Sequence, residues 1–177
     1  VQRTDTSKIP VIDVSGAINR TGLEGVAADI YQAATDHGFF YISGHGISPS
    51  MCGKAFSISK KFFELSLEDK KLVSVNTSQR GWMAKGMSQL SGAKTHDLKE
   101  VFFWGYETKL NDPDFLAGKP LVAVNQWPTQ TFPELKISLL PYYEAVCKVA
   151  GDLMAAIAVS LGQDKGFFDN FYKKPLA

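Results

Sequence analysis

Apolar residues recur at helical spacing in two stretches near the start of the chain. The first stretch opens with the Thr21-to-Glu24 spacing of a capping box and ends at Gly38. The second follows Ser48 and Pro49, a pair that favours a helix cap and a first helical turn. The first stripe is Leu23, Val26, Ala27, Ile30 and Ala34, and the second is Met51, Ala55, Ile58, Phe62 and Leu65. The pattern therefore predicts two amphipathic helices.

Two further helices are predicted downstream. Ser66 precedes a short acidic turn, and acidic side chains are favourable near the positive end of a helix. A second capping-box spacing, Thr131 to Glu134, predicts a long helix that reaches Leu161. Pro141 lies within that stretch and should kink or break the helix, because proline removes a backbone donor and crowds the preceding turn.

The strand signals are fewer and widely separated. Residues 9–14 alternate, residues 39–42 are aromatic and β-branched, and residues 99–106 return to a β-prone pattern. Residues 73–99 predict a long exposed loop, and residues 107–130 predict irregular structure. Three short strands that lie far apart in sequence imply an open sheet edge, which a partner or a further segment should cover.

Composition narrows the function classes. Of 177 residues, 45% are hydrophobic and 21% charged, which is typical of a soluble globular protein, and a net charge of +1 gives no case for nucleic acid or an anionic membrane. No apolar run approaches the roughly 18 residues of a membrane span. Cys52 and Cys147 are interpreted as buried small hydrophobes in a reducing, cytoplasmic compartment, with a disulfide as the alternative. The lysine pairs at 60–61 and 70–71 are interpreted as solvated helix faces.

Each histidine admits a structural and a chemical interpretation. His45 lies between two glycines and is expected to be a turn residue with a backbone hydrogen bond, with a metal ligand as the alternative. His37 is expected to interact with the dipole at a helix C-terminus. His96 and Asp97 are adjacent, and an acid–base pair is the alternative to an ordinary loop.

Six short motifs occur in an order that resembles a known family. They are Ile-Pro-Val-Ile-Asp at 9–13, Gly-Phe-Phe-Tyr at 38–41 leading to His45-Gly46, Phe62-Phe63 followed by Leu67-Glu68-Asp69-Lys70, Arg80-Gly81-Trp82, Asp97 to Phe102, and Asn125-Gln126-Trp127-Pro128. Together they are similar to the N-terminal region of the isopenicillin N synthase-like family of non-haem Fe(II)/2-oxoglutarate-dependent oxygenases. A Gly-Tyr pair is commoner in that family where this chain has Gly81-Trp82.

The resemblance implies an α+β fold class: helices with a few short strands that brace a double-stranded β-helix, or jelly-roll, core. In the family two histidines and a carboxylate hold Fe(II), and an Arg-x-Ser pair receives 2-oxoglutarate. The chain has no His-x-Asp or Arg-x-Ser sequence. We therefore expect residues 1–8 to be a loose lead-in and residues 9–177 to be the N-terminal region, with the jelly-roll core and the iron-binding C-terminal domain missing. By itself the chain should bind no metal or cofactor, have no catalytic residue and be inactive.

The resemblance also points to substrate contacts. Gln79, Met83, Val101 and Phe103 correspond to family positions at the mouth of the active site, although Val101 and Phe103 would equally suit a buried strand. The parent enzyme would hydroxylate, desaturate or cyclise a small molecule. Two alternatives stay open: an Fe(II)/O2 oxidase of the same family that does not use 2-oxoglutarate, and a non-catalytic module that binds protein through an exposed strand edge.

Overall fold

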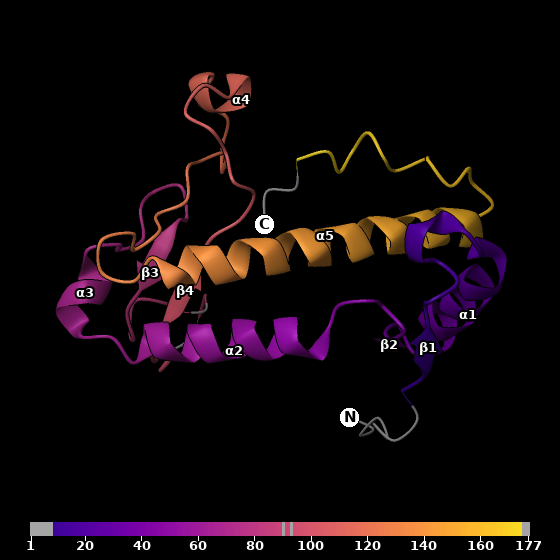
Figure 1. Cartoon of the computed structure of the whole chain (residues 1–177), viewed down its shortest axis with the longest axis horizontal. Coiled ribbons are helices and arrows are strands. Elements are labelled where there is room, and N and C mark those ends of the chain that lie inside the picture. The colour runs from indigo at the N-terminus through magenta and orange to yellow at the C-terminus, as the bar shows by residue number, and fades with distance from the viewer. Residues whose placement is uncertain (1–8, 90, 93, 175–177) are drawn as a thin grey trace. The chain divides into compact units, whose positions relative to one another are not determined.

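A computed structural model describes residues 9–89, 91–92 and 94–174 (Figure 1), so the lead-in predicted at 1–8 lies outside the described residues. As expected, short strands are mixed with helices. The strands are β1 (Val11–Asp13), β2 (Tyr41–Ser43), β3 (Gly81–Met83) and β4 (Val101–Phe103); the helices are η2 (Ile18–Arg20), α1 (Leu23–Asp36), α2 (Pro49–Phe63), α3 (Leu67–Lys71), α4 (Pro113–Leu116) and α5 (Glu134–Ser160). The chain forms two compact units, one from residues 1–52 and 141–173 and the other from 53–140 and 174–177.

In the first unit, α1 packs beside a two-stranded parallel sheet. Strand β1 pairs with β2 so that Val11 lies opposite Tyr41 and Asp13 opposite Ser43. The core contains the buried side chains of Ile12, Val14, Ala17, Leu23, Val26, Ile30, Ala33, Ala155 and Ala156. The predicted stripe of α1 is correct except at its end, because Ala33 is buried and Ala34 is exposed.

The predicted capping box at the start of α1 is wrong. The N-cap is Gly22, which has no side chain, and the Thr21 hydroxyl donates to the carbonyl of Ile18 at 3.4 Å. A close approach of two backbones explains the difference: the Gly22 N–H donates to the Gly16 carbonyl at 2.5 Å, and a Cβ on Gly16 would lie 3.0 Å from the Gly22 oxygen. The tight loop before α1 therefore requires glycine at the N-cap position.

The turn around His45 is confirmed. Gly38 ends α1 with φ +80°, and Gly44 has φ +69° beside the carboxylate of Asp13, where a Cβ would collide. The His45 Nδ1 accepts a hydrogen bond from the Ile47 N–H at 3.1 Å, which is the structural role expected of it.

The predicted cap of α2 is formed, and the short helix predicted after Ser66 is present as α3, with its own serine cap. The Ser48 Oγ accepts from the Met51 N–H at 3.2 Å, and the Ser66 Oγ accepts from the Asp69 N–H at 3.1 Å. The interpretation of the second lysine pair is wrong at Lys70, which is only 8% exposed, whereas Lys71 and both lysines of the first pair are exposed. Lys70 is buried because its ammonium donates to the Phe63 carbonyl at 2.9 Å and to a carboxylate described below.

The predicted exposed loop at 73–99 is wrong in its first third. Strand β3 lies within it, and the buried Trp82 exchanges backbone hydrogen bonds with Val73 and Val75 on its other side. The strand predicted at 99–106 is shorter, ending at Phe103. The predicted irregular segment 107–130 contains α4, whose N-cap is Asp112.

Helix α5 runs through Pro141 as a single helix, so of the predicted kink or break, the break does not occur (Figure 1). It ends at Ser160, next to the predicted end, and Gly162 follows with φ +71°. Cys52 and Cys147 are free thiols, which rules out the disulfide, and both are half-buried rather than buried.

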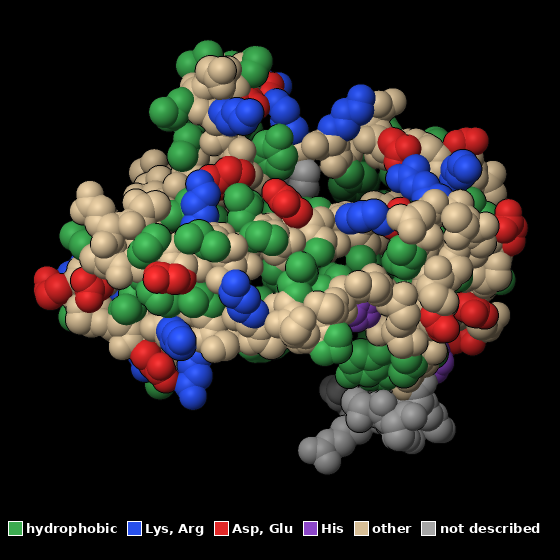
Figure 2. All heavy atoms as spheres, viewed as in Figure 1, with side chains coloured by type: hydrophobic (Ala, Val, Ile, Leu, Met, Phe, Trp, Pro, Cys, Tyr) green, Lys and Arg blue, Asp and Glu red, His purple; other side chains and the backbone are tan. Residues whose placement is uncertain are grey.

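On the face shown in Figure 2, acidic and basic side chains are interspersed rather than separated by sign. Among the described residues, no helix combines the length and apolar character needed to cross a bilayer.

Candidate functional site

Strands β3 and β4 form an antiparallel ribbon whose two faces differ. Met83 lies opposite Val101, and Gly81 lies opposite Phe103, so these residues share one face of the ribbon. Trp82 and its partner Phe102 share the other face. We call the face of Met83, Val101 and Phe103 the outward face, because the opposite side packs into an aromatic core.

The aromatic core fixes which face is turned inward. The Phe102 ring lies 4.7 Å from the Phe62 ring and 5.9 Å from the Trp127 ring, centroid to centroid. Trp104 continues the same side of the strand, with its ring 5.1 Å from that of Trp127. Trp82 is 5% exposed and Trp127 is 8% exposed. Aromatic burial of this extent leaves the outward face as the side available for other contacts.

The structure brings three of the four predicted substrate residues together. Met83, Val101 and Phe103 are all half-buried on the outward face. Gln79 is two residues before β3, is exposed and has φ +59°, so it does not belong to the paired ribbon. Val101 and Phe103 are half-buried, as is Phe102 in the aromatic core, so burial does not separate a substrate contact from the alternative of a strand core residue.

The carboxylate of Glu100, the residue just before β4, binds side chains from β3 and α3. Glu100 accepts the Trp82 indole N–H at 2.7 Å and the Lys70 ammonium at 3.0 Å. Burial alone would raise the pKa of Glu100, but the hydrogen bonds from Lys70 and Trp82 outweigh it, and the pKa lies below the ordinary 4.5. Glu100 is therefore ionised at neutral pH and ties α3 to both strands.

A second carboxylate lies just after β4. Glu107 accepts the Trp127 indole N–H at 3.0 Å, the Asn125 amide at 2.7 Å, and the Lys136 ammonium. Burial would raise its pKa, but these donors together hold the pKa of Glu107 below its ordinary value. The ribbon is thus flanked at both ends of β4 by an ionised carboxylate that binds an indole and an ammonium.

The Asn125-Gln126-Trp127 motif binds Glu107 and the backbone beside each strand. Asn125 binds the backbone of Gly105 beyond β4. Gln126 donates from Nε2 to the carbonyls of Ser74 and Arg80 at 2.8 and 2.5 Å, next to β3. In the sequence this motif was visible only as a turn and a family likeness. The only sequence signal that these residues hold other segments in place was the position of two amide side chains, Asn125 and Gln126, directly before Trp127.

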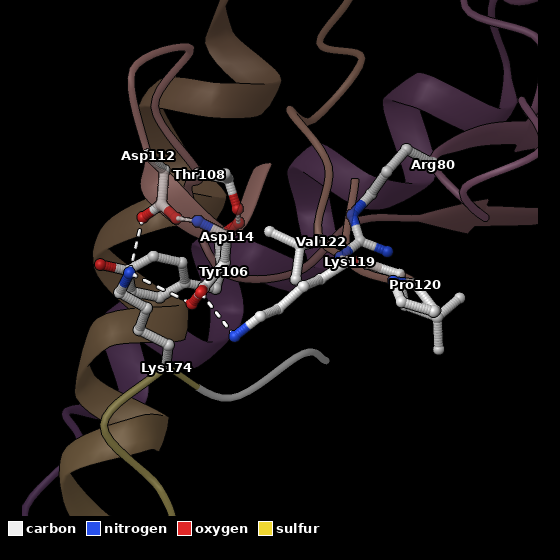
Figure 3. Close-up of a pocket in the computed structure, with 10 residues that line it drawn as sticks. Arg80, Tyr106, Thr108, Asp112, Asp114, Lys119, Pro120, Val122 and Lys174 are labelled. Carbon is white, nitrogen blue, oxygen red and sulfur yellow. Dashed lines mark hydrogen bonds and ion pairs between the residues drawn. The ribbon is translucent and has the colours of Figure 1, made fainter. Parts of the chain in front are cut away.

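The same unit contains a pocket of about 310 Å³, shown in Figure 3. Its polar wall consists of ion pairs: Lys174 contacts Asp112 at 2.7 Å and Asp114 at 3.6 Å, and Lys119 contacts Asp114 at 2.7 Å. Arg80 also lines it and donates to the Leu121 carbonyl at 3.1 Å. The two ammonium groups and the two carboxylates already bind one another, and the Arg80 guanidinium gives the lining one more cation than anion.

The histidines do not assemble a metal site in the described part of the chain. No group of three or more His, Cys, Asp or Glu side chains there could hold a metal ion. His37 is the C-cap of α1, as expected. His96 is exposed, and the neighbouring Asp97 binds Lys99 at 2.9 Å and Ser88 at 3.2 Å. The described residues therefore do not fit the iron site of the family.

The fold is shared with oxygenases of known structure. A protein from Caulobacter crescentus assigned to the 2OG-Fe(II) oxygenase family superposes with a TM-score of 0.78 at 23% identity over 92% of this chain and 51% of that one. A protein from Neurospora crassa, solved at full length in complex with alpha-KG, superposes with a TM-score of 0.74 at 28% identity over 92% of this chain and 50% of that one.

Residues 9–130 match the family described as non-haem dioxygenase in morphine synthesis N-terminal. The chain belongs to this family, the N-terminal part of the non-haem 2-oxoglutarate/Fe(II) oxygenases, which confirms the resemblance found in the sequence. It is 32% identical to the 2-oxoglutarate-dependent dioxygenase caaD of Aspergillus niger over 169 residues, or 93% of this chain and 51% of the relative. The chain thus spans about half the length of the curated relatives it matches.

Proposed function

We propose that the parent protein is an Fe(II)- and 2-oxoglutarate-dependent oxygenase that oxidises a small molecule, and that residues 9–177 form its N-terminal region. The observation that carries this proposal is the family match over 9–130, together with relatives named as 2-oxoglutarate-dependent dioxygenases. Iron, 2-oxoglutarate and the jelly-roll core would belong to the other half of the protein, the C-terminal catalytic domain. When bound there, iron and 2-oxoglutarate would supply the oxidant.

The contribution of this chain would be one wall of the substrate entrance. Met83, Val101 and Phe103 share the outward face, and Gln79 lies just before it. An apolar face held by a rigid ribbon suits contact with a small organic substrate, because apolar side chains supply most of the lining of such sites. The free thiols of Cys52 and Cys147 favour a cytoplasmic protein.

The test of the activity is turnover by the protein encoded by the complete gene. We expect succinate and CO2 to form from 2-oxoglutarate in the presence of Fe(II) and O2, and a chelator to stop the reaction. Iron-dependent O2 consumption without 2-oxoglutarate would favour the oxidase alternative. Absence of any O2 consumption, with a protein partner bound, would favour the non-catalytic module.

The test of the site uses Val101→Ala and Phe103→Ala in the same protein, with Leu98→Ala as the matched control because Leu98 is 88% exposed outside the ribbon. We expect the KM for the organic substrate to rise about tenfold in the first two variants, from lost apolar contact. The KM for 2-oxoglutarate should not change. Equal effects in the control variant would remove the outward face from the substrate site.

A further inference from the structure

Three consecutive side chains reach three different segments around the ribbon. Asn125 reaches the chain after β4, Gln126 reaches the chain before β3, and Trp127 reaches the aromatic core through its ring. A single short segment therefore contacts both strands from outside their own ladder. Such an arrangement fixes the strands relative to each other even though each is only three residues long.

Glu107 decides the orientation of the first of these side chains. One Asn125 amide N–H is bound by the Glu107 carboxylate, and this leaves the Asn125 Oδ1 directed at the Gly105 N–H, at 3.0 Å. Rotating the amide by half a turn would place its oxygen against the carboxylate, which is repulsive. Glu107 also holds the Trp127 ring by its N–H, so one carboxylate orients two of the three contacts.

Gln126 acts as a double donor that no carboxylate could replace. Its Nε2 donates to two backbone carbonyls, those of Ser74 and Arg80. Nearby Gly81 has φ +110°, and a Cβ there would lie 2.7 Å from the same Nε2. The amide of Gln126 is thus packed directly against the first residue of β3.

These contacts determine which side chains of β3 and β4 lie on the outward face and which lie against the aromatic core. Side chains alternate across a strand, so a slip of one residue would move Met83, Val101 and Phe103 to the core side and Trp82 and Phe102 to the outward side. Three-residue strands have few ladder hydrogen bonds to prevent such a slip. Contacts from residues outside the two strands must therefore contribute much of what fixes the register of β3 against β4.

We propose that Glu107 and Gln126 are positioning residues that hold the β3–β4 ribbon in the register that presents the outward face to the substrate. Gln126 acts through the backbone beside β3, and Glu107 acts through the side chains of Asn125 and Trp127. The consequence for substrate affinity rests on the proposed function, whereas the hold on the ribbon can be tested without it.

The first experiment needs no substrate and uses the 177-residue chain in D2O. Glu107→Gln and Gln126→Glu are compared with Glu64→Gln and Gln130→Glu, the same changes at exposed positions. We expect peptides covering 81–83 and 101–103 to exchange at least about tenfold faster in the first two variants, because local opening reports local stability. Peptides of α1 should exchange as in the wild type. Uniformly faster exchange, or no change at the ribbon, would overturn the proposal.

If Glu107→Gln does not fold, Lys136→Met can be used instead, because it removes only one donor from the same carboxylate. We expect the β3 and β4 peptides to exchange faster in this variant too, by a smaller factor. Lys136→Arg keeps a cation there and should restore wild-type exchange. Failure of Lys136→Arg to restore exchange, with Lys136→Met impaired, would mean that a cation beside Glu107 is not what holds the ribbon, and would overturn the role of that carboxylate.

The second experiment uses the complete protein and, as its probe, the compound that most stimulates 2-oxoglutarate turnover by the wild type. In Glu107→Gln and Gln126→Glu we expect the KM for that compound to rise about tenfold, with kcat and the KM for 2-oxoglutarate within about twofold. Loss of kcat together with both KM values would indicate a merely structural role and overturn the proposal. A wild type without 2-oxoglutarate turnover would refute the proposed function, and the exchange experiment would then decide the positioning role.

Discussion

The side chain of Asn125 pairs with both backbone groups of Gly105. Its Oδ1 accepts the Gly105 N–H at 3.0 Å, and its Nδ2 donates to the Gly105 carbonyl at 2.9 Å. Both residues are buried. The asparagine amide therefore takes the place that a neighbouring strand would occupy, just where β4 has ended and its backbone still needs partners.

Replacing Asn125 should destabilise the second unit strongly. In Asn125→Ala the Gly105 N–H and carbonyl stay buried without this partner, so we expect a loss of about 3 kcal/mol in the free energy of unfolding. Urea denaturation measures it. Asn111→Ala, at an exposed position, is the matched control and should stay within about 0.5 kcal/mol of the wild type. A comparable loss in both variants would contradict the assignment.

Gly81 should tolerate no side chain. Its φ is +110°, and a Cβ would press against the carbonyl oxygens of Val73 and Ser74, which belong to the backbone and cannot move aside. We expect Gly81→Ala to cost more than about 2 kcal/mol, measured by thermal unfolding. Gly53→Ala is the control: it lies in α2 with open space around it, and alanine there should be neutral or stabilising by up to about 1 kcal/mol.

The Lys70–Glu100 pair should make stability depend on pH. The two side chains are 10% and 20% exposed, so Lys70→Met leaves a mostly buried carboxylate without its cation, at a cost of about 3 kcal/mol near neutral pH. The pKa of Glu100 is below its ordinary 4.5 in the folded protein. A carboxyl of this kind contributes stability above its unfolded pKa and loses that contribution as the pH falls through its folded pKa.

The difference in unfolding free energy between wild type and Lys70→Met should therefore shrink as the pH falls below the ordinary carboxyl pKa of 4.5 and through the lower folded pKa, because protonated Glu100 no longer needs the cation. Urea denaturation across a pH series would show it. Lys71→Met, which removes a lysine 53% exposed in an i,i+3 pair, should change stability by less than about 0.5 kcal/mol at any pH. A difference independent of pH would mean that Lys70 acts by packing alone.

The Arg20–Asp169 contact should be visible in the titration of the aspartate. The guanidinium donates to both carboxylate oxygens, at 2.8 and 2.7 Å, and these hydrogen bonds hold the pKa of Asp169 below the ordinary 3.8. In Arg20→Met we expect the pKa of Asp169 to rise toward that value, as followed by carboxyl-carbon NMR. Asp112, whose pKa the Lys174 ammonium holds below the ordinary 3.8, serves as the internal reference, and its pKa should not change in this variant.

The sequence was sufficient to predict those features that depend on residues close together along the chain. The Ser48 cap, the Gly38 stop and the His45 turn depend on residues within a few positions of one another, and all are as predicted. The family followed from motif order alone. The outward positions of Met83, Val101 and Phe103 at the substrate stay a prediction.

Contacts between distant residues decided the rest. No local pattern distinguishes Lys70 from the exposed Lys71, since the burial of Lys70 depends on a carboxylate 30 positions away in addition to the Phe63 carbonyl. Strand β3 was not predicted because three residues are too few to show an alternating pattern. It is held by backbone pairing with Val73 and Phe102 and by the Gln126 side chain next to Gly81. Neighbouring residues along the chain specify the helices, most of their caps and the family. Which face of the ribbon is buried depends on aromatic rings and carboxylates that only folding brings together from separate segments.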